Sequence, residues 1–182
     1  MNACEDNSEE KWFVMRDLHR WNSNHPAWQT LSDSGLEVFT PLQWKVTLIK
    51  GHRFRRHVAV IPDLVFVKGS RETLDTIVAK DPLLQYRFVK NCGGRPMTVR
   101  ETEMQLFIKA VNSNSKVKYY TPDELSSLHK GKKVRIISGP LHGFEGTLLS
   151  VRGSKVRRLF VEIPEIVAAA VEVKPEFIEI IE

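Results

Sequence analysis

The sequence predicts an α+β protein with two domains: an antiparallel sheet packed with helices, then a flexible linker and a small five-stranded β-barrel. Three observations lead to this prediction. Strand and helix patterns alternate over residues 11–111, residues 112–120 are polar, and short apolar segments separated by glycine and proline follow from Val134 onward. We therefore expect a disordered leader at 1–10, a first domain at 11–112, a linker at 113–127 and a second domain at 128–182.

Apolar runs with aromatic and β-branched residues predict the strands of the first domain. They cover residues 11–16, 35–41, 44–49, 58–67 and 83–89. Pro62 and Asp63 indicate a bulge or an interruption in the fourth strand. Residues 50–57 are expected to form a basic loop between the third and fourth strands.

Three helices are expected in the first domain. A short one precedes Gly35, which is a good helix terminator. Ser70 is placed to cap a second helix over 71–80, whose apolar residues recur on one face. Thr98 and Glu101 form a capping box for a third helix, which closes the domain.

Five short strands predict the barrel of the second domain. They read VRIIS, GTLLSV, RLFVEI, AAAVEV and FIEII. The segment 165–173 leaves two alternatives open, because its alanines favour a helix while its valines alternate as in a strand.

Composition excludes several classes of protein. The chain has 182 residues, a net charge of +5 and a pI near 9.3, which favours a polyanionic partner. No apolar stretch is long enough to span a membrane, and the first ten residues are acidic and polar, unlike a secretory signal. Cys4 and Cys92 are the only cysteines, so we expect a reduced cytoplasmic protein without a disulfide framework.

No motif indicates an enzyme. The chain lacks a glycine-rich phosphate loop, a histidine pair at metal spacing and a serine in a nucleophile elbow. We expect no catalytic residue, no cofactor and no bound metal.

The most specific motif is KKVRIISGPLHGFEGTLLSV at residues 132–151. A basic strand runs into the Gly139-Pro140 turn, an aromatic residue follows, and Gly146 opens the next strand. This segment resembles the KOW motif of NusG-type elongation factors and some ribosomal proteins, which implies an SH3-like barrel.

The first domain is similar to the N-terminal domain of the same family. The resemblance is carried by the Trp12-Phe13-Val14 strand, the GLEVFTP strand, the basic loop before IPDLVFV and the final helix, and with the KOW motif it covers nearly all of 11–182. The family's aromatic-proline-glycine-tyrosine turn reads Ile61-Pro62-Asp63-Leu64 here. That departure resembles a specialised paralogue of the RfaH or UpxY kind.

The resemblance implies that the first domain binds the clamp helices of bacterial RNA polymerase. The matching positions are Phe13, Ile61, Leu64 and Phe66. The alternative is that all four are core residues. For Phe13 and Phe66, which lie within strands, a core role and a binding role are equally expected. For Ile61 and Leu64, which lie beside the proline, exposure is expected.

Two basic segments are candidates for nucleic-acid contact. Arg53, Arg55 and Arg56 surround Phe54 in the predicted loop, where charge favours phosphate and the family position implies DNA in the elongation complex. A solvated hairpin tip is the alternative. The second candidate set is Arg16, His19 and Arg20, which lie at the end of the first strand. The resemblance implies contact with DNA there, since the specialised paralogues touch the non-template DNA strand at this position. The alternative is a generic polar rim.

The KOW loop carries Leu141, His142 and Phe144. In the family the aromatic residue of this loop, which matches Phe144, contacts a small-subunit ribosomal protein or the termination factor Rho. An aromatic side chain in a short loop favours contact with a partner, unless Phe144 folds back on Leu141. The resemblance thus implies a monomeric transcription elongation or antitermination factor. The alternative is a KOW-type RNA-binding or ribosome-associated protein that holds RNA with the basic strands of its barrel.

Overall fold

The computed structural model describes residues 8–19, 26–49, 51–90, 92–113, 117–121, 124, 130–149 and 157–181. The chain divides into two compact units, Met1–Glu101 and Thr102–Glu182, here called unit 1 and unit 2. Most of the predicted leader, residues 1–7, lies outside the described residues. No helix among those described is long and apolar enough to cross a membrane.

Unit 1 is built on an antiparallel sheet with the order β2-β5-β1-β6, in which β7 also pairs with β1. The strands are β1 (Lys11–Asp17), β2 (Glu37–Phe39), β5 (Val65–Gly69), β6 (Leu84–Tyr86) and β7 (Thr98–Val99). The apolar runs therefore predicted the strands near 11–16, 35–41 and 83–89 correctly.

Two helices cover one face of this sheet, α1 (Ala27–Asp33) and α2 (Arg71–Lys80). Leu31 and Leu74 from these helices join Phe13, Met15 and Tyr86 in one buried apolar cluster. Ser70 caps α2 as predicted, because its hydroxyl oxygen accepts the backbone N–H of Thr73 at 3.2 Å.

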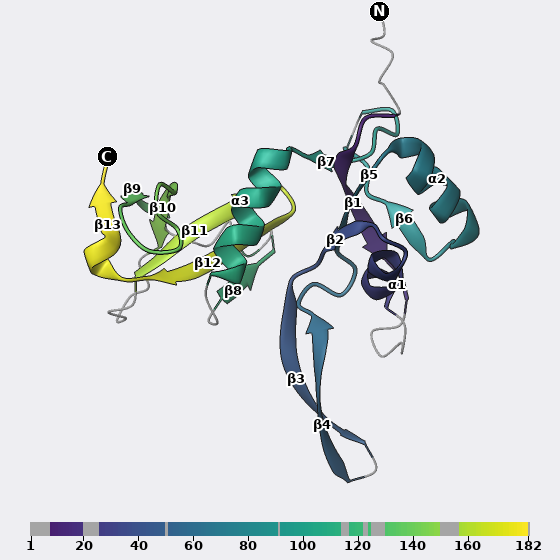
Figure 1. The fold of residues 1–182 in the computed structure, drawn as a ribbon, viewed down its shortest axis with the longest axis horizontal. Coiled ribbons are helices and arrows are strands. Elements are labelled where there is room, and N and C mark those ends of the chain that lie inside the picture. The colour runs from purple at the N-terminus through teal and green to yellow at the C-terminus, as the bar shows by residue number, and fades with distance from the viewer. Residues whose placement is uncertain are drawn as a thin grey trace, which may run out of the picture. The chain divides into compact units, whose positions relative to one another are not determined.

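The predicted strand 58–67 is interrupted, as Pro62 and Asp63 indicated. β4 (His52–Ala59) ends before the proline, the chain turns at Pro62 and Asp63, and β5 begins at Val65. β4 pairs with β3 (Leu42–Ile49) along its whole length. The two strands form a separate ribbon that runs away from the rest of unit 1 (Figure 1).

The prediction of a basic loop at 50–57 was wrong for most of that segment, since residues 52–57 belong to β4. A ribbon that is exposed on both faces can hold charged residues in regular strand structure without burying them. The third helix also begins later than predicted. Thr98 pairs with Phe13 in β7, so α3 spans Glu101–Asn112.

Unit 2 contains a six-stranded antiparallel sheet with the order β13-β9-β10-β11-β12-β8. Its strands are β8 (Val117–Tyr120), β9 (Lys130–Ile136), β10 (Glu145–Leu149), β11 (Arg157–Ile163), β12 (Val167–Val173) and β13 (Ile178–Ile180), with the short 3-10 turn η1 (Pro175–Phe177) before the last. All five predicted strands are present, and the ambiguous segment 165–173 forms strand β12. Among the described residues β13 and β8 do not pair with each other, so the sheet does not close into the predicted barrel.

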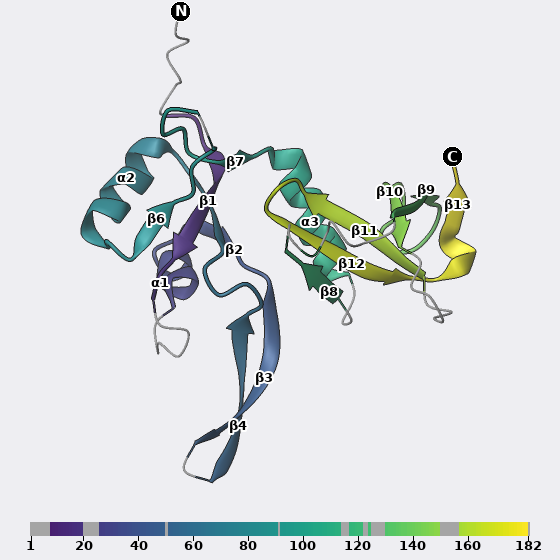
Figure 2. The same cartoon turned by 180° about the vertical axis from the view of Figure 1, so that it is seen from behind.

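The predicted linker 113–127 is partly wrong, because β8 pairs with β12 from Val117 to Tyr120. Tyr120 is buried in a cluster with Ala168 and Ala170, so the polar composition of the preceding residues concealed a strand. The boundary also lies earlier than 112, since α3 falls almost entirely within unit 2. α3 and β12 overlap in the projection that Figures 1 and 2 share, and residues Val167–Val171 of β12 are fully buried.

Candidate nucleic-acid interface

The β3–β4 ribbon carries the densest basic segment of the chain. Of its 18 residues from Leu42 to Ala59, five are Lys or Arg and none is Asp or Glu. Gly51, beside β4, has a φ of 81°, a left-handed conformation that glycine adopts without strain. The ribbon is therefore a strongly cationic element of two paired strands.

Cross-strand register assigns the ribbon's side chains to two faces, because directly opposite residues of an antiparallel pair point the same way. The first face, here called the Trp44 face, is formed by Leu42, Trp44, Val46, Leu48, Arg53, Arg55, His57 and Ala59. The second, here called the Phe54 face, is formed by Gln43, Lys45, Thr47, His52, Phe54, Arg56 and Val58. The three arginines predicted to act together are thus divided, with Arg53 and Arg55 on one face and Arg56 on the other.

The Trp44 face is open to solvent. The exposed fractions are 58% for Trp44, 57% for Val46 and 69% for Leu48. The Trp44 ring stacks against the His57 ring with centroids 3.7 Å apart, and the Arg55 guanidinium lies 4.9 Å from the Trp44 ring centroid. A cation–π contact of this kind holds an arginine in place and leaves its N–H groups available to a ligand.

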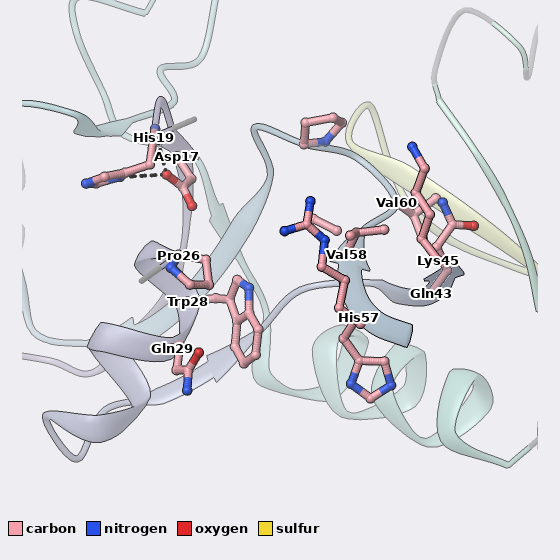
Figure 3. Close-up of a pocket in the computed structure, with 13 residues that line it drawn as sticks. Asp17, His19, Pro26, Trp28, Gln29, Gln43, Lys45, His57, Val58 and Val60 are labelled. Carbon is pink, nitrogen blue, oxygen red and sulfur yellow. Dashed lines mark hydrogen bonds and ion pairs between the residues drawn. The ribbon is translucent and has the colours of Figure 1, made fainter. Parts of the chain in front are cut away.

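The Phe54 face turns partly inward. It borders a cavity of about 510 Å³ in unit 1, where Lys45 and His57 lie on one side and Trp28 and His19 on the other (Figure 3). Arg56 also lines this cavity. Arg56 is accordingly half-buried, whereas Arg53 and Arg55 are exposed.

The predicted cationic group at the end of β1 is already engaged by carboxylates. The Asp63 carboxylate lies 3.5 Å from the Arg16 Nε atom and 3.0 Å from an Arg87 nitrogen. The ring of His19 contacts Asp17 at 2.8 Å and Asp81 at 3.4 Å. Arg20 lies outside the described residues. His19 therefore links β1 to the end of α2, a structural role that the sequence pattern did not indicate.

The predicted polymerase-binding residues are mostly core residues. Phe13 packs edge-on against Tyr86 in the cluster beneath α1 and α2, with ring centroids 5.7 Å apart. Phe66 and Leu64 are fully buried, and only Ile61 is half-exposed. The expected exposure of Leu64 was wrong, because Leu64, which lies between this turn and the start of β5, is buried.

This turn is held at both ends by hydrogen bonds. The Leu64 carbonyl accepts the buried Thr40 hydroxyl at 2.8 Å, and the Asp63 carbonyl accepts the backbone N–H of Asp17 at 3.3 Å. The Leu18 backbone N–H donates to the Leu83 carbonyl at 2.8 Å. Three accessible apolar residues among those described at this end of β1 are Leu18, Leu83 and Ile61. We call these three residues the β1 rim.

The KOW loop in unit 2 is closed by its own side chains. Leu141 and Phe144 are buried, with Phe144 only 6% exposed, whereas His142 is exposed. Gly143 donates its N–H to the Ile136 carbonyl at 2.7 Å and has a φ of 82°. The aromatic residue thus folds back against the domain, which is the alternative that the sequence left open.

Two arginines on the strands of unit 2 are paired with carboxylates. Arg135 donates to Glu145 at 2.6 Å and also faces Glu179, and these carboxylates raise the pKa of the Arg135 guanidinium. Arg158 pairs with Glu172 at 3.3 Å. Arg152 and Lys155, which are further basic residues of this unit, lie outside the described residues.

The sequence analysis missed Trp44, Val46 and Leu48 as surface residues, since an apolar alternation normally indicates a half-buried strand. A signal was available in the register of the two strands. Apolar residues occupy every second position of the first strand, at Trp44, Val46 and Leu48, and arginines occupy every second position after the turn, at Arg53 and Arg55. If the two segments pair as a hairpin, both sets lie on one face. That combination is unsuited to a core.

The described geometry is that of an α+β protein with a protruding cationic ribbon. No protein-family model and no curated protein matches the sequence. Among solved structures the chain is similar to one titled "Domain interaction in Thermotoga maritima NusG". That match has 17% sequence identity and a TM-score of 0.48, and it covers 97% of this chain and 99% of that chain.

Proposed function

We propose that this chain is an accessory factor of bacterial RNA polymerase that acts in transcription elongation or antitermination. The observation that carries the proposal is the β3–β4 ribbon, whose lysines and arginines are uncompensated by any carboxylate of the ribbon and whose arginines stand beside exposed apolar side chains. Such a surface suits contact with nucleic acid in a transcription complex. The sequence resemblance of residues 11–182 to NusG-type factors supports the same function. Binding, not bond chemistry, performs it.

The polymerase contact is proposed at the β1 rim, in place of the buried residues Leu64 and Phe66. Leu18 and Leu83 expose 39% and 44% of their surface, and Ile61 adds a half-exposed side chain. Arg16, Arg87 and Asp63 lie at the same end of β1. An apolar patch with a polar border is the usual composition of a protein interface.

A second partner, a small-subunit ribosomal protein or Rho, is proposed at unit 2. His142 on the KOW loop and Ile137 after the end of β9 are exposed there. Phe144 supports the loop from within instead of reaching the partner.

The proposal is tested by retention of core RNA polymerase on the immobilised full-length chain. Ile61→Asp and Leu18→Asp each place a charge on the β1 rim without opening the core, so each should reduce retention at least about ten-fold. Leu106→Asp is the matched control, because Leu106 on α3 is 46% exposed and belongs to unit 2.

Retention by the wild-type chain and by Leu106→Asp, with loss in both rim variants, supports polymerase binding at the β1 rim. If the wild-type chain retains no polymerase, the proposed function is wrong. Retention that survives both rim substitutions would instead place the contact elsewhere on the chain.

A further inference from the structure

The cavity that the Phe54 face borders is formed by two parts of unit 1. The end of β1 and the start of α1 supply His19 and Trp28 on one side, and the base of the ribbon supplies Lys45 on the other (Figure 3). The volume of about 510 Å³ lies in the range of about 300–1,000 Å³ in which proteins hold small molecules. None of the three β1 rim residues is among those that line the cavity. The cavity is therefore separate from the surface proposed for polymerase.

Two cations of the ribbon meet at this cavity. Lys45 and Arg56 both line it and are directly opposite each other in the strand register, so their Cβ atoms are about 5 Å apart. Like charges in this position destabilise a strand pair, and an anion beside both side chains would offset that effect. Arg56 is half-buried, which strengthens its attraction for an anion because less water screens it. The ribbon side of the cavity therefore favours an anionic group.

The one carboxylate among the described lining residues is already engaged. Asp17 accepts the backbone N–H of His19 at 2.9 Å and that of Ala27 at 3.2 Å, and it contacts the His19 ring at 2.8 Å. A carboxylate has about four acceptor positions, so three of them are occupied. Asp17 therefore offers little to a cationic ligand, and Lys45 and Arg56 determine the charge that the cavity prefers.

Apolar surface also lines the cavity. Trp28 is half-buried and packs against the buried cluster of unit 1, so the core holds its indole in place. Val58 and Val60, also half-buried, add apolar surface from the ribbon and the residue that follows it. A flat ring placed against an indole gains from ring pairing as well as from burial. The cavity therefore favours a ligand with a ring as well as a charge.

We propose that this cavity binds a small organic anion that carries a flat ring. The ring lies against Trp28, and its carboxylate or phosphate group lies beside Lys45 and Arg56, which bind either group through charge-assisted hydrogen bonds. Gln29 and Gln43 also line the cavity, and their amides donate and accept hydrogen bonds, which suits polar atoms at the edge of the ring. A ligand in this position contacts both α1 and the base of the ribbon.

Neither half of such a ligand uses the whole site. A free phosphate or acetate ion fills a small part of about 510 Å³ and leaves Trp28 without a contact. A neutral ring covers Trp28 but leaves the like charges of Lys45 and Arg56 facing each other. The ring and the anionic group must therefore be joined in one molecule.

The test is a titration of the isotope-labelled full-length chain, followed by the NMR signal of the Trp28 indole N–H, which Trp28→Phe identifies by its loss. The two probes are naphthoate and naphthyl phosphate, which share a ring and differ in the anionic group. At least one should shift the Trp28 signal saturably, and the tighter of the two identifies the preferred anion. Naphthol, acetate and inorganic phosphate supply the ring or the anion alone, and each should bind at least about ten-fold more weakly.

Substitutions in the ribbon test where the anionic group lies. Arg56→Gln and Lys45→Gln should each weaken binding of the tighter probe by about ten-fold or more, because each removes a charge-assisted hydrogen bond. Arg55→Gln is the matched control, since Arg55 is the neighbouring residue of the same strand but belongs to the Trp44 face. Its affinity for the probe should equal that of the wild-type chain. Circular dichroism of each variant checks that the fold is intact.

Four results would overturn the proposal. They are the lack of a saturable shift with either probe, binding of naphthol or of a ringless anion as tight as that of the probes, equal losses in Arg55→Gln and Arg56→Gln, and a larger shift at the Trp44 indole than at the Trp28 indole. The last result would place the ligand on the Trp44 face instead. A Trp28 shift that depends on Arg56 and Lys45, but not on Arg55, supports the site.

Discussion

At the scale of single residues, burial of Tyr119 in β8 raises the pKa of its phenol to about 12, from an ordinary value near 10. The folded protein therefore holds this proton more tightly than the unfolded chain does. The stability contributed by Tyr119 is fully present below about pH 10 and is lost as the pH rises towards about 12. Burial also raises the pKa of Tyr86 in unit 1, with a hydrogen bond to Asp75 acting in the same direction.

We predict that the free energy of unfolding falls as the pH rises from about 10 to about 12, and that it falls less steeply in Tyr119→Phe. Urea denaturation at several pH values in this range measures both slopes. Phenylalanine keeps the ring and removes the ionisable group, so packing is held constant. Parallel slopes would show that Tyr119 ionises equally in the folded and unfolded chains.

Residue types were predicted more successfully than residue exposure. Ser70 was recognised as a helix cap because capping depends on its neighbours in sequence. Leu64 and Phe144 were expected at the surface because each lies beside a turn, yet both are buried. Whether a side chain beside a turn points outward depends on the strands packed next to it, which are distant in sequence.

At the scale of elements, β10 and β11 are close enough that Gly146 cannot carry a side chain without displacement. A Cβ atom at Gly146 would lie 2.9 Å from Leu159 Cδ1 and 3.1 Å from the Phe160 carbonyl oxygen. The sequence indicated glycine here for the reversal of the chain. The structure shows that the neighbouring strand imposes the requirement, since Gly146 has an ordinary φ.

We therefore predict that Gly146→Ala destabilises the protein by about 1–3 kcal/mol, the usual effect of overpacking. Gly69→Ala in β5 is the control, because its Cβ would lie 3.5 Å from the nearest atom, an ordinary contact. Thermal unfolding of the two variants gives the comparison. If the two substitutions have equal effects, the close approach of β11 is not what requires glycine at 146.

Element types followed from periodicity, but pairing did not. The strands were found because apolar residues recur at every second position, and the helices because they recur at every third or fourth position. Both spacings are local properties of the sequence. The β3–β4 ribbon was predicted as two strands and a loop, since six charged or aromatic residues in a row do not alternate with apolar ones. Only the register with Leu42–Ile49 shows that they continue a strand.

At the scale of the whole molecule, helix α3 was expected to complete the first domain, whereas Thr102–Asn112 belongs to unit 2. Its buried residues include Met104, Phe107 and Val111. Residues Val167–Val171 of β12 are buried on both faces of the sheet, as a strand requires when it lies in the middle of a layered core. An apolar stripe on a helix shows that the helix packs, without showing which sheet it packs on.

This assignment predicts the behaviour of two fragments. Residues 102–182 retain α3 and should unfold cooperatively. Residues 113–182 lack the buried apolar side chains of α3 and should be less stable by several kcal/mol, since burial of each large apolar side chain contributes about 1.5–3 kcal/mol. Thermal unfolding followed by circular dichroism, with dye binding to report exposed apolar surface, distinguishes the two. Equal stability of the fragments, together with a gain in stability of 1–112 over 1–101, would return α3 to the first domain.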